Sequence, residues 1–151
     1  MTIRCEIVSQ DRSVFEGDVD IVVIPGTDGE MGILPNHAPL LSTIRMGVIK
    51  VRRDGEEQLF TITGGLVEVQ PTIVTILADA AENIAEIDLA RAEEAKRRAE
   101  QRLAEGVPSD AEAYLAAESA LRRSTLRLEM AQRYGRTRRK SDFPTPGSGE
   151  H

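Results

Sequence analysis

The hydrophobic pattern of this 151-residue chain changes character near residue 80. Before that point, apolar residues often alternate with polar ones, as Ile3, Cys5 and Ile7 do, and glycine and proline punctuate the runs. After it, apolar residues repeat at intervals of three and four, and alanine, glutamate and arginine dominate. Alternation is typical of half-buried strands, and the longer interval is typical of amphipathic helices. The sequence therefore predicts an α+β chain with its strands first and its helices second.

Turn signals divide the first part into several short strands. Asp54-Gly55 stands between two apolar runs, and both residues tolerate the positive φ of a tight hairpin turn. Gly64-Gly65 and Gln70-Pro71 separate further runs in the same way. Short strands at this spacing predict an antiparallel sandwich or a barrel over residues 1–84.

The second part predicts an antiparallel two-helix hairpin over residues 85–134. Its apolar stripes consist mostly of small residues, namely Ala92, Ala95, Ala99 and Leu103, followed by Tyr114, Ala117, Leu121, Ser124, Leu128 and Ala131. Gly106 and Pro108 break the helices, and Ser109 with Glu112 has the form of a capping box. Because small residues bury little apolar area, we expect a weak seam. Residues 135–151 have the composition of a disordered tail.

Arginines recur on one face of each predicted helix. Arg91 and Arg98 are seven residues apart and Arg123 and Arg127 are four apart, so each pair shares a face at about 3.6 residues per turn. In an antiparallel hairpin these faces can meet, and guanidinium groups bind phosphate or carboxylate through paired hydrogen bonds. The alternative is a solvated charged face, with Asp88 as a helix-start residue.

Composition and motifs argue against several classes of protein. The net charge of −6 and the absence of Trp disfavour a nucleic-acid surface. Two histidines and one cysteine provide no metal or nucleophilic cluster, and the glycine-rich segment 26–32 lacks the lysine of a phosphate loop. His37, alone in its loop, is more typical of a contact residue than of a catalyst. We therefore expect a protein that is not an enzyme.

No targeting or membrane-spanning segment is expected. The N-terminus enters a strand pattern directly, without the features of a secretion or import signal. No apolar run approaches the roughly 20 residues that span a bilayer. Any association with a membrane is therefore expected to come through a partner.

Three separated blocks resemble the ε subunit of bacterial and chloroplast F-type ATP synthase. They are the segment from Pro25 to Leu41 with its glycines, Glu30 and His37, the segment Gly64-Gly65-Leu66-Val67-Glu68-Val69, and the segment from Val74 to Asp79. This resemblance implies a flattened N-terminal β-sandwich that clasps the γ subunit and rests on the membrane c-ring, followed by a mobile two-helix domain. It further implies that Glu30 faces the c-ring and that His37 lies toward γ.

The hairpin resembles the ATP-binding form of this family, whose pattern Ile/Leu-Asp-x-x-Arg-Ala is matched by residues 87–92. The ATP-binding positions implied by the resemblance are Glu82, Ile87, Asp88, Arg91, Ala92, Arg98, Arg123 and Arg127. ATP would be a regulatory ligand and not a required cofactor, and no cluster of protein ligands implies Mg²⁺.

The resemblance implies a non-catalytic rotor subunit that couples γ to the c-ring and inhibits ATP hydrolysis through its hairpin. In the compact state the arginines would hold ATP and close the hairpin against the sandwich. In the extended state the helices would rise along γ into the α3β3 hexamer, where the arginines would face an acidic segment of β. The implied location is peripheral, at the cytoplasmic face of the bacterial inner membrane or the stromal face of the thylakoid. The alternatives are a free-standing ATP-sensing module and a small nucleic-acid-binding β-barrel.

Overall fold

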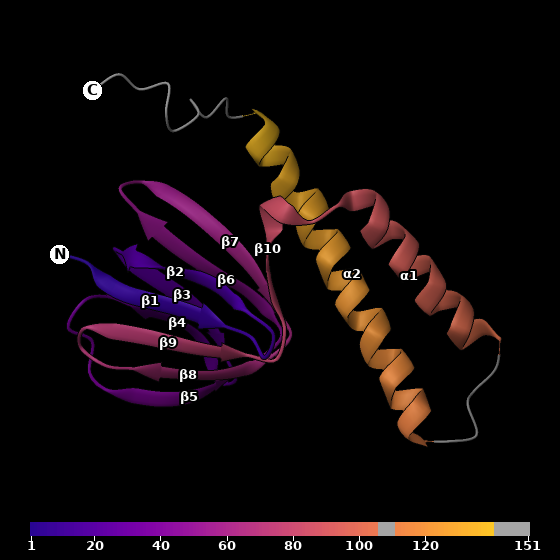
Figure 1. Ribbon diagram of the computed structural model, residues 1–151, viewed down its shortest axis with the longest axis horizontal. Coiled ribbons are helices and arrows are strands. Elements are labelled where there is room, and N and C mark those ends of the chain that lie inside the picture. Colours follow the sequence, from indigo (N-terminus) through magenta and orange to yellow (C-terminus); the bar gives the residue numbers. More distant parts are fainter. Residues whose placement is uncertain (106–110, 141–151) are drawn as a thin grey trace. The chain divides into compact units, whose positions relative to one another are not determined.

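The computed structural model describes residues 1–105 and 111–140, with side chains described as far as residue 133. The chain divides into two compact units, Met1–Ile87 and Asp88–His151. The first unit contains ten strands and a short 3-10 helix, and the second contains two helices (Figure 1). The predicted α+β class, a β-sandwich followed by a helical hairpin, is confirmed.

The ten strands form one hydrogen-bonded sheet. They are β1 (Ile3–Val8), β2 (Ser13–Val19), β3 (Ile21–Gly26), β4 (Gly29–Ile33), β5 (Leu40–Ile44), β6 (Gly47–Arg53), β7 (Glu56–Ile62), β8 (Gly65–Val69), β9 (Ile73–Ala78) and β10 (Ala81–Asn83). Their order is β10-β7-β6-β3-β5-β8-β9-β1-β2, with β4 paired to β3. Only Gly26 and Ile44 join β3 to β5, so the sheet folds at this point into two layers. All pairs are antiparallel except β1 with β9, a parallel pair within the expected antiparallel sandwich.

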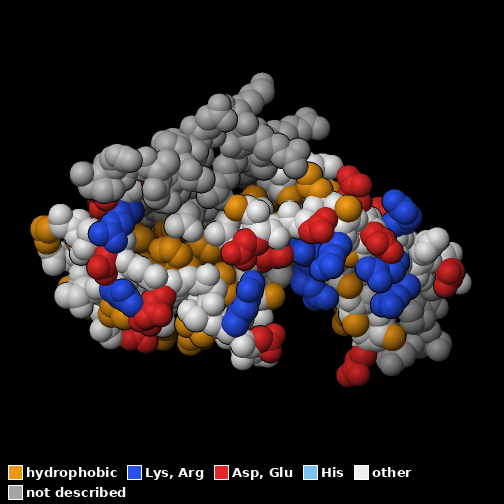
Figure 2. Space-filling view, turned by 45° about the horizontal axis from the view of Figure 1, so that its top comes forward, with side chains coloured by type: hydrophobic (Ala, Val, Ile, Leu, Met, Phe, Trp, Pro, Cys, Tyr) orange, Lys and Arg blue, Asp and Glu red, His pale blue; other side chains and the backbone are white. Residues whose placement is uncertain are grey.

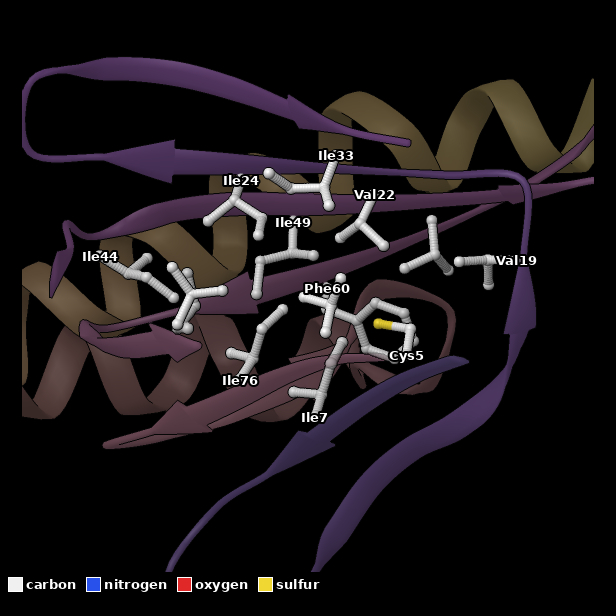
Figure 3. Close-up of a cluster of buried hydrophobic side chains, with 14 of the residues drawn as sticks. Cys5, Ile7, Val19, Val22, Ile24, Ile33, Ile44, Ile49, Phe60 and Ile76 are labelled. Atoms are coloured by element: carbon white, nitrogen blue, oxygen red, sulfur yellow. The ribbon is translucent and has the colours of Figure 1, made fainter. Parts of the chain in front are cut away.

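The core lies between these two layers. Ile3, Cys5 and Ile7 are buried on β1, as their alternation with polar residues predicted. Figure 3 shows the side chains of Cys5 and Ile7 pointing into the same space as that of Phe60 from the other layer. The rings of Phe15 and Phe60, on strands that do not pair, lie 5.5 Å apart between centroids and tilted by 60°. Such cross-layer aromatic contacts add to the stability that burial provides.

The turn between β6 and β7 confirms the hairpin that Asp54-Gly55 predicted. Asp54 has a φ of 52° and Gly55 a φ of 81°, the left-handed conformation that this two-residue turn requires. The Asp54 amide also donates a hydrogen bond of 2.8 Å to Oδ2 of Asp20. This second contact fixes the turn against the loop that connects β2 and β3.

The helices are α1 (Leu89–Ala104) and α2 (Ala111–Lys140), preceded by the 3-10 helix η1 (Ile84–Glu86). The predicted helix break at Gly106 and Pro108, and Ser109 of the capping box, lie outside the described residues. Helix α2 continues through residues 135–140, where a disordered tail was expected from residue 135. Arginine and lysine favour helix and Pro144 is the next proline, so the single Gly135 does not end α2. The rest of the predicted tail, residues 141–151, lies outside the described residues.

Candidate anion-binding groove in the helical hairpin

A groove of about 730 Å³ lies between α1 and α2. Small residues from both helices line it, namely Ala95, Ala99, Ala113, Ala116, Ala117, Ala120 and Ser124. Four of them, Ala95, Ala99, Ala117 and Ser124, belong to the predicted stripes, and Ala113, Ala116 and Ala120 do not. Methyl and hydroxymethyl side chains leave space between two helices that longer side chains would fill. The alanine-rich stripe therefore produces a hollow, and not a tightly filled seam.

Three arginines line the same groove, Arg98 and Arg102 from α1 and Arg123 from α2. Figure 2 shows Lys and Arg side chains gathered on the helical part of the chain, with Asp and Glu side chains around them. Arg98 and Arg123 belong to the set that the sequence predicted, and the structure brings them together. Arg102 and Glu105, which also line the groove among the described residues, were missed. The four-residue spacing between Arg98 and Arg102 is the signal that could have identified Arg102.

Two adjacent arginines on α2 have different surroundings. Arg123 lines the groove, and its Nη1 donates a hydrogen bond of 3.2 Å to Oγ of Ser119. Arg122 does not line the groove, and its Nη2 lies 3.2 Å from Oε1 of Glu118, an exposed i, i+4 ion pair. Of these two arginines, only Arg123 lines the groove, whereas Arg122 forms an ion pair on the exposed surface.

The start of α1 holds the matched Asp-x-x-Arg-Ala segment. Asp88 is the N-cap residue, and its Oδ1 accepts a 3.2 Å hydrogen bond from the backbone N–H of Arg91. The Arg91 side chain is exposed, whereas Ala92 is buried. None of these three residues lines the groove, and neither does the half-buried Arg127. The predicted arginines therefore do not all converge on one hollow.

Glu82 and Ile87 belong to the first unit. Glu82 lies on β10 opposite Thr61 of β7 and is half-buried. Ile87 follows η1 directly, and its backbone N–H donates to the carbonyl oxygen of Ile84 at 3.2 Å. The division between the two units therefore passes through the matched segment, between Ile87 and Asp88.

The two predicted partner contacts, Glu30 and His37, lie at opposite ends of β5. Glu30 is exposed near the β3–β4 turn, where the amide of Thr27 donates to the carbonyl oxygen of Thr43 at 3.4 Å. His37 is half-buried in the loop after β4, with its Nδ1 2.8 Å from the carbonyl oxygen of Ala38. Next to it, Asn36 has a φ of 63°, and its amide donates to Pro71 at 2.9 Å. Glu30 and His37 therefore belong to separate surfaces.

Cys5 is buried in the core of the sandwich. Burial, and secondarily the charge of Glu6, raises the pKa of the Cys5 thiol from 9.0 to about 12. The thiol is therefore protonated at neutral pH, and thiols react mainly as thiolates.

The described residues show neither a metal site nor a membrane span. In the part of the chain that the structure describes, no three His, Cys, Asp or Glu side chains gather closely enough to hold a metal ion. Within the same part, no helix is both long and apolar enough to cross a membrane.

Both units match known protein families. Residues 2–84 match the family described as "ATP synthase, Delta/Epsilon chain, beta-sandwich domain". Residues 85–132 match "ATP synthase, Delta/Epsilon chain, long alpha-helix domain". The order of the two matches is the order of the two units, and together they define the class as a δ/ε chain of ATP synthase.

Bacterial relatives narrow this class. The chain is 52% identical over 103 residues to the ATP synthase epsilon chain of Pelotomaculum thermopropionicum, covering 68% of this chain and 77% of the relative. It is 46% identical over 134 residues to that of Dehalococcoides mccartyi strain BAV1, with 87% and 93% covered. It is 42% identical over 132 residues to that of Halalkalibacterium halodurans, with 87% and 98% covered. The chain belongs to the family of ATP synthase ε subunits of the bacterial type.

Solved structures share the fold at low sequence identity. A chain in the Euglena gracilis mitochondrial ATP synthase, comprising OSCP, F1 and c-ring, matches with a TM-score of 0.65 and 23% identity, covering 89% of this chain and 81% of that one. A chain in the central stalk and c-ring of Tetrahymena thermophila mitochondrial ATP synthase matches with a TM-score of 0.58 and 14% identity, covering 87% and 97%. The two-unit architecture is therefore found in ATP synthases of distant organisms.

Proposed function

We propose that this chain is a non-catalytic subunit of the ATP synthase rotor that links γ to the c-ring and regulates ATP hydrolysis through its helical hairpin. Membership in the ε family supports the rotor role, and the two similar folds come from assemblies described as F1 with c-ring and as central stalk with c-ring. Because its relatives are bacterial, we expect the chain to lie peripherally at the cytoplasmic face of the inner membrane. Residues 1–84 would form the docking domain and residues 85–134 the regulatory domain.

The observation that carries the regulatory proposal is the groove lined by Arg98 and Arg123. These two cations come from different helices, and their guanidinium groups suit the oxygens of a polyphosphate. ATP is the proposed ligand, because the Asp-x-x-Arg-Ala segment resembles the ATP-binding form of the family. Asp88 would accept a hydrogen bond from a neutral donor of the nucleotide. Arg91 and Arg127, which flank the groove along the helices, would complete the cationic surface.

ATP would control the hairpin by mass action. A ligand that binds only the compact hairpin stabilises it by about 2.7 kcal/mol at a hundredfold excess over Kd. Because alanines line the groove, α1 and α2 bury little apolar area against each other. Separating the two helices in the extended state therefore costs little free energy. A free energy of this size can therefore decide between the compact and extended states. In the extended state, the same arginines would meet an acidic segment of β in the α3β3 hexamer.

An exposed apolar strip on the sandwich is the proposed γ contact. Leu66 of β8 lies opposite Leu77 of β9, and their side chains are 43% and 54% exposed. Leu41 of β5 is also exposed and lies diagonally across from Leu66, because Thr43 is the direct partner of Leu66. Exposed apolar patches of this kind mark interaction surfaces.

The neighbouring loops extend this docking surface. The strip adjoins the loop between β4 and β5, which carries His37, the residue matched to a γ contact. Glu30 lies at the other end of β5 and is the proposed c-ring contact. The sandwich would therefore offer each partner its own surface.

Isothermal titration calorimetry of the isolated protein tests ATP binding. The variant Arg98→Ala plus Arg123→Ala removes two groove cations, and we expect its ATP affinity to fall more than about 100-fold, since each charged hydrogen bond contributes about 1.5–3 kcal/mol. The matched control is Arg97→Ala plus Arg122→Ala, which makes the same charge change at neighbouring positions outside the groove. Equal loss in both variants, or no ATP binding by the wild type, would reject the proposed ligand.

Regulation requires the assembled enzyme. Removing residues 86–151 deletes the hairpin and leaves the strands of the sandwich intact. ATP synthase containing this shortened chain should assemble and hydrolyse ATP faster than the wild type. An unchanged hydrolysis rate in a correctly assembled complex would argue against regulation by the hairpin while leaving the rotor role in place.

A further inference from the structure

Arg102 lines the hairpin groove. It is neither one of the arginines predicted from helical spacing nor one of the eight positions implied by the family resemblance. It lies four residues after Arg98 on α1, so the two side chains share a face and are separated by about 6 Å along the helix axis. Arg102 therefore extends the cationic side of the groove by one helical turn toward the C-terminus of α1.

The directions of the side chains bring Arg102 and Arg123 toward one another. Helical side chains lean toward the N-terminus of their own helix. Because α1 and α2 are antiparallel (Figure 1), Arg102 leans away from the hairpin connection and Arg123 leans toward it. The hydrogen bond from Arg123 to Ser119, one turn back along α2, shows this lean directly. The two guanidinium groups thus approach the middle of the groove from opposite helices.

The charges of the groove arginines are not neutralised by described carboxylates. The ion pairs described within the helices use other cations, such as Lys96 with Glu100 at 3.9 Å and Arg122 with Glu118 at 3.2 Å. Among the residues whose side chains are described, none forms an ion pair with Arg98 or Arg102. Two arginines without carboxylate partners beside a hollow favour an anionic ligand.

The position of Asp88 gives this ligand a direction. Its carboxylate at the start of α1 repels phosphate and can accept a hydrogen bond from a neutral donor. Asp88 lies on α1 before the groove lining begins, so a nucleotide with its base near Asp88 would extend its phosphates along α1, past Arg98 and toward Arg102. The outermost phosphate would then lie closest to Arg102. Glu105, which lines the groove one turn further on, repels any longer polyphosphate.

We propose that Arg102 is an additional phosphate-binding residue that contacts the outermost phosphate of the nucleotide and thereby distinguishes ATP from ADP. The inference rests on the proposed function of the hairpin as an ATP site. It assigns a specificity-determining role to a residue outside the eight matched positions. ADP lacks the phosphate that Arg102 would contact, so Arg102 contributes to ATP binding and little to ADP binding.

Calorimetry on the full-length chain with ATP and with ADP tests this role. In Arg102→Ala, ATP binding should weaken about 10- to 100-fold, the range for one lost charge-assisted hydrogen bond, while ADP binding changes less than about threefold. The control is Arg97→Ala, which removes an exposed arginine of α1 outside the groove and should leave both affinities unchanged. Alanine favours helix, so both variants should keep α1 intact, which circular dichroism checks.

The outcomes separate this inference from the proposal on which it rests. If the wild type binds ATP and Arg98→Ala plus Arg123→Ala abolishes binding, but Arg102→Ala binds normally, the ATP site stands and the role of Arg102 is overturned. Equal weakening of ATP and ADP in Arg102→Ala overturns the role in discrimination. Absence of ATP binding by the wild type overturns both proposals.

Discussion

Asp88 and Arg91 are joined by two interactions at the first turn of α1. Oδ1 of Asp88 accepts a 3.2 Å hydrogen bond from the Arg91 amide, and its Oδ2 lies 3.8 Å from Nε of the same arginine. The Arg91 side chain is 87% exposed, so the ion pair contributes little to stability. The capping hydrogen bond is the structural part of this relationship. Asp88 therefore has a structural role as the N-cap of α1, in addition to the ligand contact proposed for it.

Substitution of Asp88 separates these two roles. Asp88→Ala removes the cap and should destabilise α1 by about 1 kcal/mol, seen as faster hydrogen exchange of amides in its first turn. Asp88→Asn keeps a capping side chain and should exchange nearly as slowly as the wild type. If capping is the only role of Asp88, Asp88→Asn will also bind ATP normally. Equal exchange rates in Asp88→Ala and the wild type would contradict the capping role.

Gly65 is a position where we expect a single methyl group to disrupt the sandwich. Its φ is +153°, and a Cβ built there would lie 2.2 Å from the carbonyl oxygen of Leu77 and 3.0 Å from Cα of Ala78. Both atoms belong to the backbone of β9 and cannot move without breaking the β8–β9 pairing. Gly65→Ala should therefore lower the free energy of unfolding by at least about 3 kcal/mol, measured by urea denaturation.

Gly32 provides the control for this substitution. Its added Cβ would meet only Cδ1 of Ile21, at 3.7 Å, an ordinary van der Waals contact. Gly32→Ala should stay within about 1 kcal/mol of the wild type, because alanine loses less conformational entropy than glycine on folding. A similar loss of stability in both variants would show that the close approach at Gly65 is not the cause.

Local sequence signals were sufficient for much of the sandwich. The alternation of Ile3, Cys5 and Ile7 identified the buried face of β1, and Asp54-Gly55 located a hairpin turn. Strand β10 was missed because three residues, Ala81–Asn83, are too few to show an alternating pattern. The parallel pairing of β1 with β9 was missed for another reason. It joins Arg4 to Ile73, and no turn signal exists for a contact between such distant segments.

The candidate site was predictable only in part. Helical spacing predicted that the faces carrying Arg98 and Arg123 can meet in a hairpin, and the structure shows both residues lining one groove. Spacing could not predict the groove itself, because a hollow depends on how closely two alanine-lined helices approach. It also could not predict that Arg91 and Arg127 lie outside the lining. Which arginines share a hollow is a property of the packed pair of helices and not of either helix alone.

The buried thiol of Cys5 should make stability depend on alkaline pH. Its pKa is raised to about 12 in the folded chain, so the folded state retains a proton that the unfolded state releases above about pH 9. The free energy of unfolding should therefore fall as pH rises from 9 to 12, by at most about 1.4 kcal/mol per pH unit from this group. Cys5→Ala removes this contribution, and the difference between the two urea-denaturation profiles isolates it from other titrating groups. Parallel profiles for the two proteins would contradict the prediction.

The apolar pair Leu66 and Leu77 should matter for assembly and not for folding. Both residues are already about half exposed, so Leu66→Thr plus Leu77→Thr should change the free energy of unfolding by less than about 1 kcal/mol, and threonine keeps the preference for strand. Affinity for the γ subunit should fall at least about tenfold if these residues lie near the centre of the interface, as measured by surface plasmon resonance. A folded Leu66 and Leu77 variant that binds γ as tightly as the wild type would show that this strip faces another partner.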